Sequence, residues 1–130
     1  NLYIPYLIYK LYTIIMKTET IQLSSNGVVT FYIGKDAHDN THIVKNGNCD
    51  DLWFHADDYS SCHVVASMPN NCTKKEKRQI IKAGALLCKQ NTNKLKSERD
   101  VSIVYTKIKN ITTTSTPGLV HHTNGQTIRI

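Results

Sequence analysis

The fold of this chain is decided by two neighbouring segments, 51–56 (DLWFHA) and 61–67 (SCHVVAS). In both segments residues of different character alternate, which is the period-two pattern of a β-strand with two different faces. The connection between them, 57–60 (DDYS), is short and polar, as a tight antiparallel link requires. Pairing of the two strands would bring His55 and His63 together.

The first of these strands has one face that is plainly apolar. This face consists of Leu52, Phe54 and Ala56, whereas Trp53 and His55 point to the opposite side. We therefore expect the first face to lie in the main core. The second face is expected to form a smaller core beneath a loop.

The part of the chain before these strands predicts a β-hairpin. Segments 20–23 (TIQL) and 28–33 (VVTFYI) flank 24–27 (SSNG), whose Asn-Gly pair tolerates the positive φ angles that hairpin turns favour. A turn at 34–36 (GKD) and a short strand at 42–44 (HIV) are expected to follow.

A long helix is predicted in the second half of the chain. Thr73 and Glu76 fit a capping box, so the helix should begin there and run to about Asn91. At 3.6 residues per turn, one side of this helix is apolar or small and a narrow arc on the other side is basic. The apolar side carries Ile80, Ile81, Ala83, Gly84, Leu87 and Cys88, and the basic arc carries Lys75, Arg78, Lys82 and Lys89.

The C-terminal part returns to strand patterns. Segment 101–105 (VSIVY) predicts a strand, a threonine-rich polar loop ends at 116–118 (TPG), and 127–130 (TIRI) predicts a closing strand. Together these elements predict an α+β fold, an antiparallel β-sheet with one long amphipathic helix packed on it. The 130 residues contain no internal repeat, and we expect one domain at 16–130.

Residues 1–15 (NLYIPYLIYKLYTII) are apolar and aromatic, and we interpret them as an extension outside the domain. The run is shorter than the roughly 20 apolar residues that a membrane-spanning helix needs, and Pro5 and Lys10 interrupt it. It also lacks the basic start and the small-residue cleavage site of a signal peptide. An interfacial membrane segment is the alternative. We expect a cytoplasmic protein without a membrane partner.

The composition favours a polyanionic partner and free thiols. Sixteen Lys and Arg oppose ten Asp and Glu, giving a formal net charge of +6, which suits phosphate-rich partners where the charges cluster. The four cysteines form no C-x-x-C pair, so free thiols in a reducing compartment are expected. Richness in asparagine, isoleucine, lysine and threonine is typical of an AT-rich genome, such as that of a protist or a large DNA virus.

The central segments resemble the NFACT-R domain, the RNA-binding domain of the NFACT ribosome-quality-control proteins. The residues that carry the resemblance are 51–55 (DLWFH), 61–64 (SCHV), 32–36 (YIGKD) and Asn40. It extends over about 28–130. An Asp-x-Trp-x-His strand followed by a small residue, histidine and valine is an unusual combination.

The resemblance implies a noncatalytic, nucleic-acid-binding α+β domain. Family members with several domains act on the large ribosomal subunit that carries a stalled nascent chain and its tRNA. The domain also occurs nearly alone in a small eukaryotic coiled-coil protein. The signature positions carried over to this chain are Gly34, Asp51, Trp53, His55, His63, Pro117 and Gly118.

This sequence departs from the family pattern at two places. Segment 111–114 (ITTT) follows Lys107 and Lys109, where the family often has more lysine, and this weakens an expectation of RNA contact there. Cys62 stands where the family usually has alanine or glycine before the histidine. We expect packing to tolerate this second change.

The expected nucleic-acid site is the basic arc of the long helix, extended by lysines on loops. Its residues are Lys75, Arg78, Lys82 and Lys89 with Lys35, Lys107 and Lys109. The alternative is an ordinary solvated helix face, because exposed helices are commonly rich in lysine. Trp53 and Tyr59 offer rings on which bases can stack, although a tryptophan between Leu and Phe in a strand is more often core.

The histidines allow two further hypotheses. His55 and His63 would bind a metal only if Cys49, Cys62 or the pair at 121–122 (HH) completed a tetrahedron, and the spacing does not enforce this. For catalysis, His55 would need Cys62 as nucleophile or Asp57 as orienting acid. We expect neither, so no enzyme activity, cofactor or metal is predicted, and the histidines are expected to make structural hydrogen bonds.

The leading hypothesis is therefore a noncatalytic module that binds RNA, either tRNA or ribosomal RNA, with DNA and the ribosome as further candidate partners. The runner-up is an adaptor that docks on a protein or a membrane through the Trp53 surface or the apolar N-terminus. The two differ in salt dependence, because phosphate contacts weaken steeply as salt rises.

Overall fold

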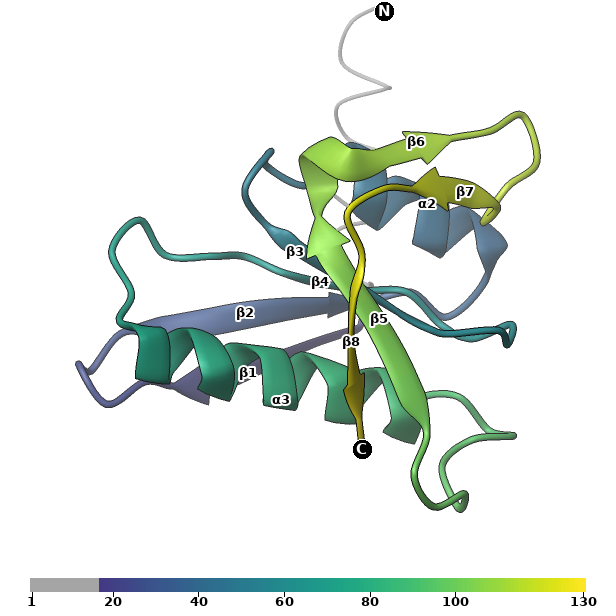
Figure 1. Ribbon diagram of the computed structural model, residues 1–130. Coiled ribbons are helices and arrows are strands. Elements are labelled where there is room, and N and C mark those ends of the chain that lie inside the picture. Colours follow the sequence, from purple (N-terminus) through teal and green to yellow (C-terminus); the bar gives the residue numbers. More distant parts are fainter. Residues whose placement is uncertain (1–16) are drawn as a thin grey trace, which may run out of the picture.

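A six-stranded antiparallel sheet forms the centre of the protein, in the strand order β1-β2-β4-β3-β5-β8 (Figure 1). The structure is a computed structural model in which residues 17–130 are described. The interpretation of residues 1–15 as an extension lies outside the described residues. The strands of the sheet are β1 (Lys17–Gln22), β2 (Val28–Ile33), β3 (Leu52–Ala56), β4 (Val64–Ala66), β5 (Ser102–Lys107) and β8 (Gln126–Arg129).

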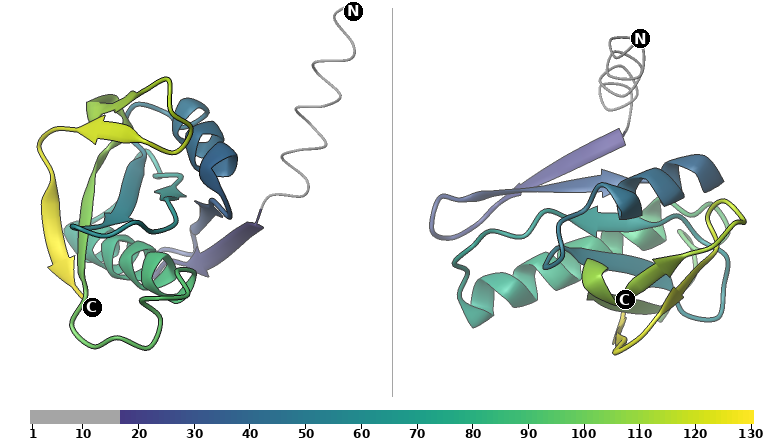
Figure 2. Two further views of the ribbon diagram at one scale, coloured as in Figure 1. Left: turned by 90° about the vertical axis from the view of Figure 1, so that its right-hand side faces the viewer. Right: turned by 90° about the horizontal axis from the view of Figure 1, so that it is seen from above.

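The remaining elements cover the two faces of this sheet. They are α2 (Ala37–Lys45), α3 (Lys74–Gln90), the 3-10 turn η1 (Ile108–Asn110), and a two-stranded sheet of β6 (Ile111–Thr113) and β7 (Val120–His122). Figure 2 shows α3 on one side of the sheet and α2 with the β6–β7 pair on the other. The predicted α+β class is confirmed. No helix in residues 17–130 is long and apolar enough to cross a membrane.

The predicted hairpin is β1 and β2. Its turn closes through a hydrogen bond of 2.7 Å from Leu23 N to Gly27 O, and Asn26 takes a positive φ of 66°. Asparagine tolerates this left-handed conformation because its short side chain bonds to nearby backbone. The predicted strands in the C-terminal part are also confirmed, as β5 and β8.

The pairing of β3 with β4 sorts their side chains as the alternation predicts. Trp53 lies opposite Val65 and Phe54 opposite Val64 in an antiparallel register. The even-numbered residues Leu52, Phe54, Val64 and Ala66 join the main core with α3. Trp53 and Val65 belong to a separate cluster on the other face. The expectation of a second, smaller core is confirmed.

Helix α3 begins as its capping box predicts. The Thr73 hydroxyl accepts a hydrogen bond from Glu76 N, and Glu76 reaches back to Thr73 N, at 3.1 Å each. Glu76 is buried and also accepts a bond of 2.6 Å from the Ser25 hydroxyl, which lowers the pKa of its carboxyl group. The cap therefore ties the first turn of α3 to the β1–β2 turn. Gly84 lies against the ring of Phe54 in the centre of the helix–sheet contact.

The prediction of a strand at 42–44 is wrong, because this segment lies in helix α2. Asp36 caps the helix by accepting a hydrogen bond of 2.9 Å from Asp39 N. The buried residues of α2 then recur at helical spacing: Asp39, Asn40, Ile43 and Val44. Two β-branched residues suggested a strand, but packing against the second core and a good N-cap outweigh their weak local preference. The expected single helix on the sheet is therefore accompanied by a second helix.

The second core lies between α2, the sheet and the β6–β7 pair. Its buried members are Ile43, Val44, Trp53, Val65 and Val104. The threonine-rich stretch, predicted as a loop, supplies β6 and pairs with β7. These short strands cover the small core, so that face of the sheet carries polar and aromatic groups that water only partly reaches.

Gly84 gives a direct test of the contact between α3 and the sheet. A Cβ atom at this position would overlap the ring of Phe54. We expect Gly84→Ala to lower the free energy of unfolding by about 1–3 kcal/mol, because the overlap outweighs the helix preference of alanine. Urea denaturation measures this. Gly27→Ala is the control, since its Cβ would lie 3.7 Å from Leu23; equal stability of both variants would contradict the packing.

Candidate functional site

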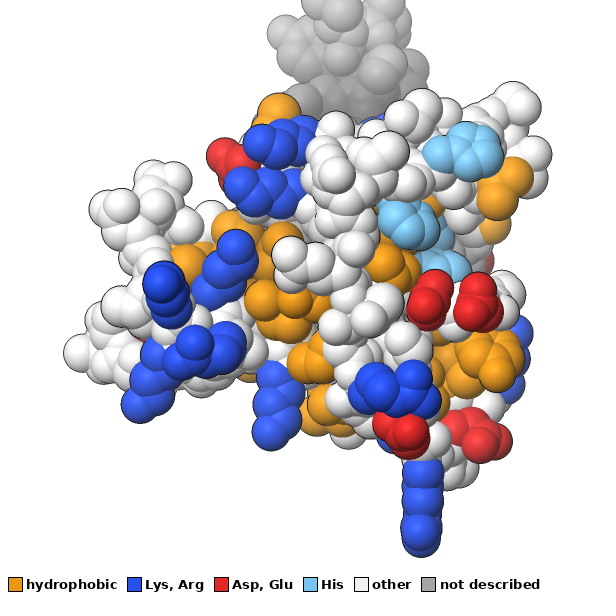
Figure 3. All heavy atoms as spheres, in the orientation of Figure 1, with side chains coloured by type: hydrophobic (Ala, Val, Ile, Leu, Met, Phe, Trp, Pro, Cys, Tyr) orange, Lys and Arg blue, Asp and Glu red, His pale blue; other side chains and the backbone are white. Residues whose placement is uncertain are grey.

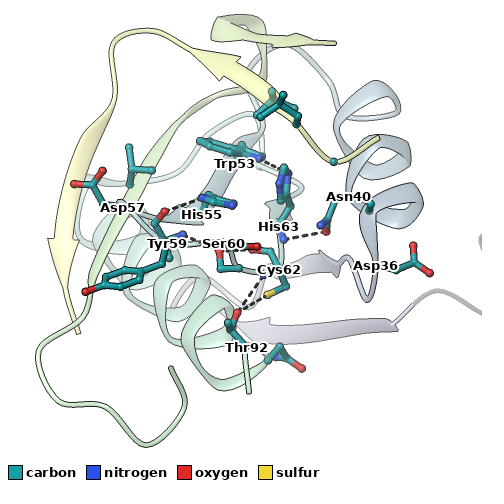
Figure 4. Close-up of a pocket in the computed structure, with 18 of the residues that line it drawn as sticks. Asp36, Asn40, Trp53, His55, Asp57, Tyr59, Ser60, Cys62, His63 and Thr92 are labelled. Atoms are coloured by element: carbon teal, nitrogen blue, oxygen red, sulfur yellow. Dashed lines mark hydrogen bonds between the residues drawn. The ribbon is translucent and has the colours of Figure 1, made fainter. Parts of the chain in front are cut away.

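A cavity of about 980 Å³ opens beside Trp53, His55 and His63, between the start of α2 and the segment that follows α3. Four segments frame it: the β3–β4 connection 57–62, the start of α2, the segment 91–94 after α3, and 117–120 before and within β7. Figure 4 shows Trp53, His55 and His63 side by side at its floor. The site is therefore built from parts that are distant in the sequence.

The two histidines meet as the strand pairing predicts. The rings of His55 and His63 lie 4.8 Å apart between centroids and are nearly perpendicular, at 82°. Trp53 stacks on His55 at 5.6 Å and 5°, and it meets His63 edge to face at 5.5 Å. A third histidine, His122 of β7, lies 5.4 Å from Trp53.

His63 is buried, and its hydrogen bonds join several elements. Its Nδ1 accepts a bond of 3.0 Å from the Trp53 indole N–H. Its backbone N–H donates to Asn40 Oδ1 at 3.0 Å, and its carbonyl accepts from Gly34 N at 2.9 Å. Because an indole N–H only donates, neutral His63 carries its proton on Nε2. A hydrogen bond with the Gly118 backbone involves the same ring.

Burial keeps both histidines of the floor neutral. It lowers the pKa of His63 to about 3, neighbouring His55 lowers it further, and the Gly118 backbone bond opposes both. The pKa of His55 is also lowered, chiefly by burial. His55 Nδ1 lies 2.7 Å from the carbonyl oxygen of Ala56, which only accepts, so the neutral ring has its acceptor lone pair on Nε2.

Trp53 is core and offers no surface for docking. Its side chain is 1% exposed, enclosed by the three histidine rings. The alternative of a tryptophan in the core is therefore confirmed, and the hypotheses that used a Trp53 surface for base stacking or partner docking are wrong. Tyr59, in contrast, is 57% exposed at the cavity.

Most signature positions gather around this cavity. Trp53, His55, His63, Pro117 and Gly118 line it. Gly34 is buried beside it, and a Cβ at this position would overlap the amide oxygen of Asn40. That oxygen is the acceptor for His63 N, so a side chain here would disrupt the hydrogen bonds of His63.

Gly118 and Asp51 serve the architecture around the site. Gly118 has a φ of +79° and donates its N–H to the Thr41 hydroxyl at 2.7 Å, which docks its segment on α2. Asp51 is buried and accepts from Asn48 N at 2.8 Å and Met68 N at 2.9 Å. It therefore links the start of β3 to the end of β4, away from the cavity lining.

Cys62 lines the cavity, and its hydrogen bonds go to Thr92 and Cys88 rather than to the histidines. All four cysteines are free thiols. Cys62 Sγ lies 3.4 Å from Cys88 O, and Cys62 N donates to the Thr92 hydroxyl at 3.1 Å. The hydrogen bond with the Cys88 thiol lowers the pKa of Cys62 and raises the pKa of Cys88 well above its usual value.

The described residues assemble neither the metal site nor the His55–Cys62 pair considered above, whereas the charge of Asp57 acts on His55 and opposes the lowering of its pKa. No group of three or more His, Cys, Asp or Glu side chains within residues 17–130 could hold a metal ion. The Cys62 thiol makes hydrogen bonds with Cys88 and Thr92, so a nucleophile–base pair with His55 is not formed in this part of the chain.

The basic arc of α3 faces away from the sheet. Lys75, Arg78 and Lys82 are exposed, whereas Lys89 is half-buried and donates to Ile130 O at 3.2 Å. In Figure 3, Lys and Arg side chains gather over α3, and histidine and acidic side chains gather on the other side of the same view. The basic arc and the histidine cluster therefore occupy different parts of the surface.

The loop lysines lie in two different parts of the structure, and neither part includes the basic arc of α3. Lys35 lines the cavity beside α2, on the other side of the sheet from α3. Lys107 is the last residue of β5 and lies 3.5 Å from Asp50, while Lys109 is exposed in η1. The structure does not bring Lys35 together with the arc into one surface.

Two residues of α2 hold the site; the sequence analysis named Asn40 only as part of the family resemblance, and it missed Thr41. Asn40 binds His63 and Thr41 binds Gly118. The signal that could have revealed them is the Asp36–Asp39 spacing at the helix start, followed by buried residues at helical period. Thr92 was also missed; its hydroxyl accepts from Cys62 N and donates to Cys88 O at 2.9 Å.

A family model described as the NFACT protein RNA binding domain matches residues 14–126. Among curated proteins, coiled-coil domain-containing protein 25 of Danio rerio is 33% identical over 87 residues, covering 66% of this chain and 42% of that protein. The Mus musculus protein of the same name is 31% identical over 96 residues, covering 70% and 44%. This chain thus spans less than half the length of these relatives.

A bacterial protein and a solved structure are also similar. The Rqc2 homolog RqcH of Streptococcus pneumoniae is 29% identical over 112 residues, which is 83% of this chain and 19% of that protein. The C-terminal structure of the fibronectin/fibrinogen-binding protein from Streptococcus suis superposes with a TM-score of 0.71 at 21% identity. It covers 88% of this chain and 45% of the other, and shows that the fold is shared.

The buried state of His63 predicts a pH dependence of stability. Its pKa is about 3 when folded and near 6.5 when unfolded, so the unfolded state binds more protons between these values. The free energy of unfolding should therefore fall as pH falls below about 6.5, by up to about 1.4 kcal/mol per pH unit from this group. Urea denaturation between pH 7 and 5 measures the slope.

His63→Gln should lower the slope of unfolding free energy against pH by the contribution of about one proton, whatever its effect on absolute stability. The control is His121→Gln, which changes an exposed histidine of β7 and should leave the slope as it is. If His63→Gln and the unmodified protein show the same pH dependence of unfolding free energy, His63 is not buried in its neutral form.

Proposed function

Because the chain belongs to the NFACT RNA-binding domain family, we propose that it is a noncatalytic module that binds RNA. The observation that carries this proposal is the family match over residues 14–126. The described chain also gives the histidines structural hydrogen bonds, which accords with a binding role.

The phosphate-binding surface that we propose is the basic arc of α3. Lys75, Arg78 and Lys82 follow one another at spacings of three and four residues, so they form a line about 10 Å long on the exposed side of the helix. A rigid helix holds this line in place while the flexible side chains adapt to phosphates. Lys89 can extend it if its bond to Ile130 O exchanges for a phosphate.

Lys107 and Lys109 are a second proposed contact. The pairing of Lys107 with Asp50 is solvent-exposed, with side-chain exposures of 41% and 76%, and an exposed ion pair contributes little energy. Lys107 can therefore leave Asp50 for a phosphate at small cost. Lys35 is proposed to act separately, at the cavity.

We further propose that the RNA is tRNA or ribosomal RNA, and that the module works in ribosome-associated quality control. The similarity to the Rqc2 homolog RqcH supports this link. Duplex DNA is the competing polyanion. Titrations with bulk tRNA and with duplex DNA at several salt concentrations distinguish the two partners. Both affinities should fall as salt rises, because both depend on phosphate contacts, but only the proposed RNA-binding function predicts a preference for tRNA.

The triple reversal Lys75→Glu, Arg78→Glu and Lys82→Glu tests the proposed surface. We expect affinity for tRNA to fall at least tenfold, because three phosphate contacts become repulsive. The slope of log affinity against log salt should become shallower by roughly 2–3 units, close to one unit per lost contact. Fluorescence anisotropy with labelled tRNA measures both quantities.

A matched control reverses three other exposed lysines, Lys45, Lys77 and Lys96, and so changes the net charge equally. It should lose affinity only through the weaker long-range attraction and keep most of the salt slope. Equal losses in both triple variants would mean that net charge, and not the arc, determines binding.

A further inference from the structure

The cavity beside the histidines has no part in the phosphate contacts proposed for α3. It is large, about 980 Å³, and none of the residues of the basic arc lines it. Its floor is fixed by the Trp53–His63 bond and by the bond from His63 N to Asn40. A floor held by buried bonds is already formed before any ligand arrives, as small-ligand sites usually are.

The charges of the cavity lining do not suit a phosphate group inside it. Two lysines, Lys35 and Lys94, are outnumbered by three carboxylates, Asp36, Asp57 and Asp58. With the histidines of the floor neutral, the lining carries a formal charge of −1. A phosphate placed within it would face more carboxylates than cations, so the cavity suits a neutral group.

The rim supplies apolar surface for a flat ring. The described chain exposes four large hydrophobic side chains, and two of them, Tyr59 and Leu119, line this cavity, at 57% and 52% exposure. Figure 4 shows Tyr59 on the β3–β4 connection, beside His55 and Asp57. An aromatic ring exposed next to a preformed cavity is a stacking platform for a base, and such stacking tolerates any base.

Polar groups of the lining can meet the edge of such a ring. His55 has its acceptor Nε2 available when Nδ1 donates to Ala56 O. Ser60 and Asn93 also line the cavity, and a hydroxyl and an amide can each donate and accept hydrogen bonds. The lining thus offers both donors and acceptors, which is what the edge of a nucleobase requires.

We propose that the cavity receives one unpaired nucleobase of a single-stranded RNA segment, stacked on Tyr59, with the flanking phosphates towards Lys35 and Lys94. This inference rests on the proposed RNA-binding function and specifies a second, chemically different contact. The arc on α3 holds phosphates, whereas the cavity detects an unpaired base. A duplex would satisfy the first contact only.

The test compares three labelled probes of equal length by fluorescence anisotropy: a single-stranded 12-mer of adenylate, a 12-mer of abasic ribose phosphates, and a 12-base-pair RNA duplex. We expect the protein to bind the adenylate 12-mer at least tenfold more tightly than the abasic one. Tyr59→Ala should remove this difference without changing the salt slope. Val28→Ala, which alters an exposed side chain of β2 outside the cavity lining, should keep it.

The outcomes separate this inference from the proposed function. Equal, salt-sensitive binding of the adenylate and abasic probes, or no effect of Tyr59→Ala, would overturn the base site and leave phosphate binding intact. If no oligomer binds, the proposed function fails. A titration with adenosine 5′-monophosphate, monitored by NMR, then tests whether the cavity binds a base. Shifts confined to 57–62 and 117–120 would support the base site, and their absence would overturn it.

Discussion

The hydrogen bond from the Trp53 indole to His63 Nδ1, 3.0 Å long and fully buried, is the interaction on which one half of this protein depends. It joins β3 to the residue that precedes β4. Through its backbone, His63 also binds Asn40 of α2 and Gly34 at the end of β2. A buried polar group without a partner would cost free energy, so these bonds fix the positions of four segments together.

The sheet consequently separates two different interiors. On one face, aliphatic and aromatic side chains pack against α3, and Gly84 lets the helix approach the Phe54 ring closely. On the other face, a small apolar cluster around Trp53 adjoins histidines and a polar cavity. The first interior supplies most of the apolar burial, which drives folding. The second keeps polar groups in defined positions, which recognition requires.

This division matters for how the domain can bind RNA. The phosphate contacts that we propose need exposed cations, and the arc on α3 has them on a helix whose other side is packed against the sheet. The base contact that we propose needs a concave site, and the cavity beside the histidines is concave. Most signature residues cluster around the cavity and none lies on α3. The family resemblance is therefore carried by the residues around the cavity rather than by the lysines of α3.

The sequence by itself determined the sheet strands around the histidines, the hairpin, helix α3 and the meeting of His55 with His63. These features follow from local rules: alternation along a strand, an Asn-Gly turn and a capping box. Helix α2, the β6–β7 pair and the cavity were decided by the tertiary structure. Their segments have weak or mixed local preferences, and contacts between residues as distant as Thr41 and Gly118 select their conformation. Such contacts leave no periodic signal in the chain.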